Sequence, residues 1–184
     1  VKIILWLISM SSKKITLSAM FIALGIVLPF ITMNIPTLGN MLLPMHIPVL
    51  LGGFILGPIY GMFIGFVTPL LRCLMFGAPI FYPNAIVMSF ELLTYGLISG
   101  VFYHIIFNRR SKLINIYISL ILAMIFGRII YGIVYLIISL ISLNEFTFNI
   151  FIMEAFINAI PGIIIQLILI PIIIKLLGGY KYVK

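Results

Sequence analysis

Apolar residues fill long stretches of this chain, and short segments rich in proline, glycine and asparagine separate them. The stretch between Lys14 and Arg72 contains no Asp, Glu, Lys or Arg. One membrane-spanning helix takes about 20 apolar residues, so this stretch is long enough for more than one helix. Breaks are expected within 34–48 and at Gly57-Pro58, because proline, glycine and asparagine usually mark the ends of helices.

The apolar pattern predicts six helices and hence an all-α integral membrane protein, with a single transmembrane domain over residues 1–184. The predicted helices cover residues 15–33, 47–56, 59–76, 84–107, 113–140 and 148–177. The second helix is short. An alternative is that Gly57-Pro58 only kinks one long helix, which would leave five spans.

The basic residues favour six transmembrane helices over five. They form clusters before the first helix, between the fourth and fifth helices, and after the sixth: Lys13 and Lys14; Arg109, Arg110 and Lys112; Lys175, Lys181 and Lys184. Six spans place all these clusters on one side of the membrane, and the opposite loops then contain only one charged residue, Glu145. By the positive-inside rule, the basic side and both termini are predicted to be cytoplasmic.

Composition excludes several other classes of protein. Of the 184 residues, 64% are hydrophobic and only 8% are charged, whereas soluble proteins have about 25% charged residues. A soluble domain is therefore excluded, and so is a disordered chain, because disorder requires low hydrophobicity. The net charge of +8 does not indicate a nucleic-acid partner, since the basic residues flank apolar segments instead of sharing one helix face.

The sequence contains no signature of enzymatic chemistry. It lacks the H-E-x-x-H, G-x-S-x-G and phosphate-binding-loop motifs, and its single cysteine, Cys73, permits neither an internal disulfide nor a cysteine-based metal site. We therefore expect no catalysis and no cofactor, and active transport would take its energy from a partner. Residues 1–12 are expected to be an interfacial stub or a non-native start ahead of Met10.

Four ionisable residues fall inside the predicted spans: Arg72, Glu91, Arg128 and Glu154. A charge at bilayer depth costs at least roughly 2.5–3.5 kcal/mol, so such residues usually pair or line a cavity. From the helix rise of about 1.5 Å per residue, all four lie between the outer surface and a little beyond the middle of the membrane. This distribution favours a pocket open to the outside. The alternative is an Arg–Glu network that only fixes helix packing.

Helix periodicity places these charges beside aromatic, amide and methionine side chains, a mixture typical of a site for a small ligand with a flat ring and polar edges. His46 lies at the predicted outer mouth, and the Pro/Gly-rich loops at 34–45 and 77–83 could cap the pocket. The predicted substrate-binding residues are His46, Arg72, Asn84, Met88, Glu91, Tyr95, Arg128, Tyr131, Tyr135, Glu154 and Asn158.

Three sequence blocks resemble a known family. They are the A-x-x-x-A pair Ala19 and Ala23, the block LPMHIPVLLGGFILGP at 43–58, and FELLTYGLISG at 90–100. Together with the chain length and the six helices, they resemble the substrate-binding (S) components of energy-coupling factor (ECF) transporters, the vitamin-uptake systems of prokaryotes. The resemblance covers about residues 13–177.

This resemblance implies a protein of the prokaryotic cell membrane that binds its vitamin on the outer side, with helices four to six and the loops after helices one and three. It also implies docking on a module of one transmembrane coupling subunit and two ATPase subunits, with Ala19 and Ala23 at the contact with the coupling subunit. S components are thought to topple within the membrane to carry the site inward.

A substrate is suggested only by the similarity of two sequence blocks to particular S components. The blocks at 43–51 and 90–96 resemble those of S components for cobalamin precursors such as α-ribazole. Glu91 and Glu154 could bond this neutral ribosyl-benzimidazole, and Tyr95, Tyr131 and Tyr135 could stack on its ring. Pantothenate, pyridoxine, folate and riboflavin are alternatives, and Arg72 and Arg128 would suit the carboxylates of pantothenate or folate. A stand-alone secondary transporter or small channel is the competing function, and a membrane enzyme is a more distant one.

Overall fold

The structure is a computed structural model that describes residues 12–33, 41–107, 113–141, 153 and 157–178. Almost all of these residues lie in helices. The helices in this part of the chain are α2 (Ser12–Met33), α3 (His46–Leu56), α4 (Pro58–Phe76), α5 (Ile86–Gly100), α6 (Leu113–Ile141) and α8 (Ile160–Gly178). The short π-helical segments η1 (Phe81–Ala85) and η2 (Val101–Ile106) extend α5 at its two ends.

Five of these helical segments are long and apolar enough to cross a membrane. They are α2, α4, the combined segment Phe81–Ile106, α6 and α8. α3 has 11 residues, which gives a length of about 16 Å, or roughly half of a hydrocarbon core about 30 Å thick. The structure therefore confirms an all-helical fold with several apolar helices, while a full crossing by all six segments stays a prediction.

The chain turns back at Gly57 and does not continue as one kinked helix. Gly57 has φ 104° and ψ 177°, a conformation that L side chains rarely adopt, and its N–H donates to the Gly53 carbonyl oxygen at 3.1 Å. Pro58 then begins α4, where a missing N–H is tolerated. A Cβ atom on Gly61 would lie 2.6 Å from the Gly53 Cα, so α3 and α4 pack as an antiparallel hairpin.

Glycines let α4 approach α5 until their backbones touch. A Cβ atom on Gly65 would collide with the Leu92 carbonyl, and one on Gly96 would collide with the Gly61 carbonyl. Close approach through small residues is a general means of holding helices together in lipid. These glycines of α4 and α5 therefore serve packing inside this chain.

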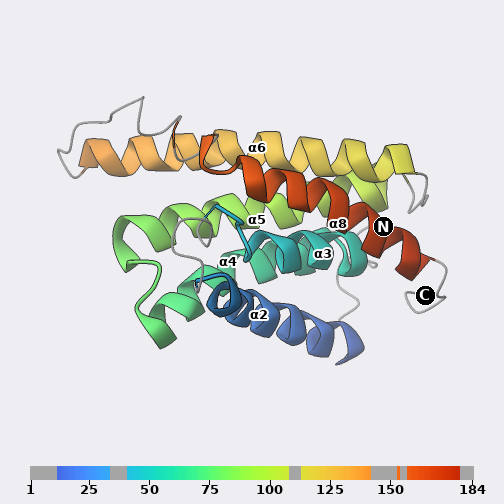
Figure 1. Cartoon of the computed structure of the whole chain (residues 1–184), viewed down its shortest axis with the longest axis horizontal. Helices are drawn as coiled ribbons and strands as arrows, with labels where there is room; N and C mark the ends of the chain where they lie inside the picture. The colour runs from blue at the N-terminus through green and yellow to red at the C-terminus, as the bar shows by residue number, and fades with distance from the viewer. Residues whose placement is uncertain (1–11, 34–40, 108–112, 142–152, 154–156, 179–184) are drawn as a thin grey trace, which may run out of the picture.

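α2 and α6 lie on opposite sides of the bundle, with α3, α4 and α5 between them (Figure 1). The first residues of α2 and the last residues of α8 lie at the same end of the bundle (Figure 1). Lys13, Lys14 and Lys175 therefore belong to one end, as the charge pattern requires. The assignment of this end to the cytoplasm remains a prediction from the positive-inside rule.

The last predicted helix begins later than expected in the described structure. Asn158 and Ala159 form a turn, and α8 begins at Ile160, with Pro161 in its first turn. A proline is tolerated there because the first N–H groups of a helix have no partner within it. The predicted start of this helix at residue 148 lies outside the described residues.

The buried core joins the short helix α3 to its neighbours. Leu50 and Phe54 of α3, Leu92 of α5, Leu120 of α6 and Ile170 of α8 are each almost completely buried. The outer faces of α2, α6 and α8 instead expose many large apolar side chains, the arrangement expected of helices that face lipid. α3 is thus an internal helix, and its first residue, His46, lies at the candidate site.

Candidate functional site

A cavity of about 490 Å³ opens beside the start of α3. This volume lies in the range of small-molecule sites. Its walls come from α2, the segment 41–45, α3, α4, the segment 78–80, η1, α5 and α6. The lining residues are Pro29, Thr32, Leu43, Pro44, Met45, His46, Arg72, Ala78, Pro79, Ile80, Asn84, Met88, Glu91, Arg128 and Tyr131.

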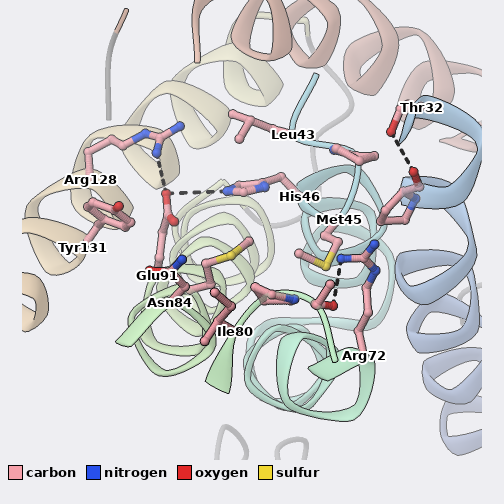
Figure 2. Close-up of a pocket in the computed structure, with 15 residues that line it drawn as sticks. Thr32, Leu43, Met45, His46, Arg72, Ile80, Asn84, Glu91, Arg128 and Tyr131 are labelled. Carbon is pink, nitrogen blue, oxygen red and sulfur yellow. Dashed lines mark hydrogen bonds and ion pairs between the residues drawn. The ribbon is translucent and has the colours of Figure 1, made fainter. Parts of the chain in front are cut away.

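One carboxylate in this cavity faces two basic side chains from other helices. Arg128 Nη1 lies 2.8 Å from Glu91 Oε1, and His46 Nε2 lies 3.5 Å from the same oxygen (Figure 2). His46 is 1% exposed, Glu91 2% and Arg128 6%, so all three are shielded by protein. Opposite charges at such short range stabilise each other strongly when water is excluded. The three residues, which we call the buried trio, join α3, α5 and α6.

Two tyrosines lie behind residues that line the cavity. The Tyr95 ring packs edge-on against the His46 ring, with 5.0 Å between ring centres, and it is 1% exposed. Gly127 makes room for it, because a Cβ atom there would collide with the Tyr95 ring. Tyr135 stacks parallel to Tyr131, at 6.2 Å between ring centres, and does not line the cavity. Tyr95 and Tyr135 therefore back the wall, whereas Tyr131 forms part of it.

Arg72 lies on the other side of the cavity from the buried trio (Figure 2). Its Nη1 donates a hydrogen bond to the Ala78 carbonyl oxygen at 3.0 Å. Its guanidinium group also lies over the Phe30 ring, 5.6 Å from the ring centre. Arg72 thus holds the segment after α4 against the cavity and places a second cationic group in the wall.

The segment 41–45 forms part of the cavity wall and belongs to the loop that the sequence suggested as a cap for the pocket. Met41 accepts a hydrogen bond from the Gly162 N–H at 3.0 Å, which anchors the segment to the first turn of α8. Leu43 has φ 48°, an uncommon backbone conformation for a leucine, and its carbonyl oxygen accepts a bond from the His46 N–H at 3.0 Å. This turn delivers His46 to the first position of α3, facing Glu91.

The structure brings most of the predicted site residues together. Those that line the cavity are His46, Arg72, Asn84, Met88, Glu91, Arg128 and Tyr131. Tyr95 and Tyr135 lie behind the wall, and Asn158, in the turn before α8, is not among the lining residues. Glu154 lies outside the described residues. Their roles toward a ligand remain predictions.

Sequence reasoning missed the contribution of α2 and the identities of the loop residues. Pro29 and Thr32 line the cavity from the end of α2, and Met45 lines it from the turn before α3. Pro29 lies inside an apolar helix, which is only a weak sequence signal for a residue that lines a cavity. Thr32 gives no such signal, because its hydroxyl donates to the Pro29 carbonyl oxygen within the same helix. Only the packing of α2 against α3 and α4 brings them to the site.

Several buried polar atoms in or near the site have no hydrogen-bond partner among the described residues. They include Nε and Nη2 of Arg128 and Nδ1 of His46. Gln166 of α8, which is fully buried and does not line the cavity, has two more. Buried polar groups in folded proteins nearly always find partners in protein, water or a ligand. In the described part of the chain, His, Cys, Asp and Glu side chains form no group able to hold a metal ion. The arrangement is therefore suited to binding a polar small molecule.

A family model for the ECF transporter, substrate-specific component, matches residues 13–174. The match covers every described helix except the first residue of α2 and the last residues of α8. No curated protein and no solved structure matched the chain in the comparisons made. Because the match extends over most of the chain and agrees with a bundle of apolar helices, this multi-pass cell-membrane protein belongs to the family of substrate-specific components of ECF transporters.

Proposed function

We propose that this protein binds a vitamin or vitamin precursor in the cavity beside α3 and passes it to an ATP-driven ECF module. The single observation that carries the proposal is the buried trio of His46, Glu91 and Arg128, which lines a cavity of about 490 Å³ in a substrate-specific component. A purely structural ion pair would not need a cavity beside it, and cavities of this size accept drug-sized molecules.

The composition of the wall supports a ligand with both apolar and polar parts. Met45, Met88 and Ile80 supply apolar surface, while Asn84 and Tyr131 supply hydrogen-bonding groups. Methionine side chains adapt their shape and make favourable contacts with aromatic rings. Vitamins that combine a ring or branched apolar body with polar edges fit this description.

The candidates from sequence fall into two chemical classes. α-Ribazole, pyridoxine and riboflavin are neutral molecules with hydroxyl groups, whereas pantothenate and folate carry carboxylates. All five compounds can be tested as ligands of this one cavity.

An exposed face of α2 supports docking on a coupling subunit. Ala19 and Ala23 lie on this face, together with the exposed side chains of Met20, Leu24 and Val27. Neither alanine lines the cavity. Two small residues four positions apart let another helix approach closely in lipid, so the partner could dock without touching the ligand.

The test is to purify the protein in detergent and identify by mass spectrometry any small molecule that copurifies. Isothermal titration calorimetry with α-ribazole, pantothenate, pyridoxine, folate and riboflavin then measures affinity without ATP. We expect one compound to bind tightly to the isolated protein, and uptake into liposomes to require the ECF module. Failure to bind any compound, or uptake by the protein alone, would contradict the proposal; the second result would indicate a stand-alone transporter.

A further inference from the structure

We infer that the ligand is an acidic molecule whose carboxylate or phosphate group binds the Nε and Nη2 donors of the Arg128 guanidinium. This inference rests on the proposed function and adds the chemical class of the ligand. It also names Arg128 as the residue that selects this class. The inference favours the acidic candidates over neutral α-ribazole.

The first observation is the incomplete hydrogen bonding of Arg128. Its Nη1 is engaged by Glu91 at 2.8 Å, whereas Nε and Nη2 are buried and have no hydrogen-bond partner among the described residues. A guanidinium has five N–H donors in one plane and binds carboxylate or phosphate through two parallel bonds. Arg128 is one of the residues that line the cavity, so an anion bound there lies beside the side chain that carries these two donors.

The second observation is that Glu91 holds Arg128 in place. Figure 2 shows the Arg128 side chain reaching from α6 to the Glu91 carboxylate, and His46 approaching the same oxygen from the other side. The planar group is therefore oriented before a ligand arrives, and its position is fixed by α5 and α3. Glu91 is a positioning residue in this scheme, because its Oε1 already faces two basic groups.

The third observation is the balance of charge around the cavity. The charged side chains among its described lining residues are Arg72, Glu91 and Arg128. The described wall therefore holds two guanidinium groups and one imidazole but one carboxylate, a balance that makes it more attractive to an anion than to a cation or a neutral sugar. Asn84 and Tyr131 add neutral hydrogen-bonding groups nearby.

A salt bridge that served packing alone is the competing explanation. Such a pair would be expected to satisfy its other N–H groups with backbone carbonyls, as Nη1 of Arg72 does with the Ala78 carbonyl. For Arg128, no such bond to Nε or Nη2 occurs within the described structure. The cavity that Arg128 lines supplies the place for the missing acceptor.

The experiment compares acidic molecules with their neutral counterparts on the full chain in lipid nanodiscs. Three pairs of probes are titrated by calorimetry: pantothenate with pantothenol, nicotinate with nicotinamide, and α-ribazole 5′-phosphate with α-ribazole. We expect the acid of the recognised pair to bind roughly 10- to 100-fold more tightly, the range for hydrogen bonds to a charged group. The first two pairs report a carboxylate ligand and the third a phosphate ligand.

Two variants connect the preference to Arg128. The double variant Glu91→Gln/Arg128→Gln removes both charges and keeps the buried pair neutral, so it avoids an uncompensated buried charge. It should weaken binding of the acid far more than binding of the neutral counterpart, and so remove the preference for the acid. Arg128→Lys keeps the positive charge but loses the planar pair of donors, so its preference should be intermediate. Thermal unfolding of each variant without ligand confirms that it is folded.

The outcomes separate the inference from the proposed function. Equal or tighter binding of the neutral member, for example α-ribazole itself, would overturn the inference and leave the proposed function intact. A preference for the acid that survives in the folded double variant would also overturn it. If none of these compounds or the vitamin panel binds and no molecule copurifies, both proposals fail together.

Discussion

Glu91 is the residue on which the site depends, because its single carboxylate meets side chains from two other helices. It lies in α5, between Arg128 of α6 and His46 of α3, and is 2% exposed. Desolvating a charged pair is costly, so a buried pair gives little net stability over apolar residues, but removing one partner leaves the other charge uncompensated. The effect of a substitution at Glu91 therefore differs from the effect of replacing both charges.

The first prediction is that Glu91→Gln destabilises the protein by about 3 kcal/mol, the cost of leaving a buried charge without its partner. Ligand affinity should fall because Arg128 is no longer held in position, while assembly with the ECF module should be retained. Chemical unfolding in detergent and calorimetry measure the two effects. The control is Glu91→Gln/Arg128→Gln, which should recover most of the stability. Wild-type stability and affinity in the single variant would remove Glu91 from the site.

At the scale of elements, the segment 41–45 and α8 depend on one glycine for their contact. A Cβ atom on Gly162 would lie 2.7 Å from the Met41 carbonyl oxygen and 2.9 Å from Leu43 Cγ. The same glycine donates the hydrogen bond that anchors the segment. Because Leu43 and Met45 line the cavity, the position of this segment controls the shape of the site.

The second prediction is that Gly162→Val weakens ligand binding at least tenfold without unfolding the bundle. The added side chain displaces a short wall segment and leaves the contacts among α3, α4 and α5 in place. The matched control is Ile160→Val, which alters an exposed side chain in the same turn of α8. Affinity and ligand dissociation rates are measured by calorimetry and stopped flow. An unchanged affinity in Gly162→Val would show that the segment does not shape the binding site.

The third prediction concerns the exposed face of α2. Ala19→Leu/Ala23→Leu should reduce assembly with the ECF module, because the larger side chains prevent close approach of another helix. Vitamin affinity should be unchanged, since neither alanine lines the cavity. The control, Ile125→Phe, enlarges an exposed side chain on α6, on the opposite side of the bundle (Figure 1). Co-purification measures assembly; a normal complex with the leucine variant would contradict docking at this face.

At the scale of the whole molecule, α3, α4 and α5 form the packed centre that positions all the other elements. Their backbones touch through glycines, and α3 is further tied to the end of the α5 segment by His104, whose Nε2 lies 2.7 Å from the Phe54 carbonyl oxygen. Protein interiors close-packed in this way tolerate little added volume where the neighbour is backbone. The integrity of the site should therefore depend on glycines far from the cavity.

The fourth prediction is that Gly96→Ala costs about 1–3 kcal/mol of stability, the usual cost of overpacking. Its Cβ atom would collide with the Gly61 carbonyl, which cannot rotate away. The matched control is Gly52→Ala, where the nearest atom is the flexible end of the Ile64 side chain, at 2.6 Å. Unfolding midpoints of the two variants measure the difference. Equal stability of both variants would show that the α4–α5 contact can open without cost.

The amino-acid sequence determined the elements, because membrane helices are encoded by local composition. Residues 59–76 and 113–140 were predicted from apolar runs, and the structure has α4 at Pro58–Phe76 and α6 at Leu113–Ile141. The place of Glu91 and Arg128 on their helices also followed from sequence, since periodicity of about 3.6 residues per turn is a local property. Membership of a transporter family agrees with what these local patterns indicated.

Only the tertiary structure decided which side chains meet. Periodicity does not determine the relative shift and rotation of two helices, which depend on glycine contacts, turns and side-chain packing across the bundle. The sequence therefore could not place Tyr95 behind the wall, bring Thr32 of α2 to the cavity or start α8 after Asn158. Nor could it place His46 and Arg128 at one oxygen of Glu91, because that contact requires three helices to pack in one register.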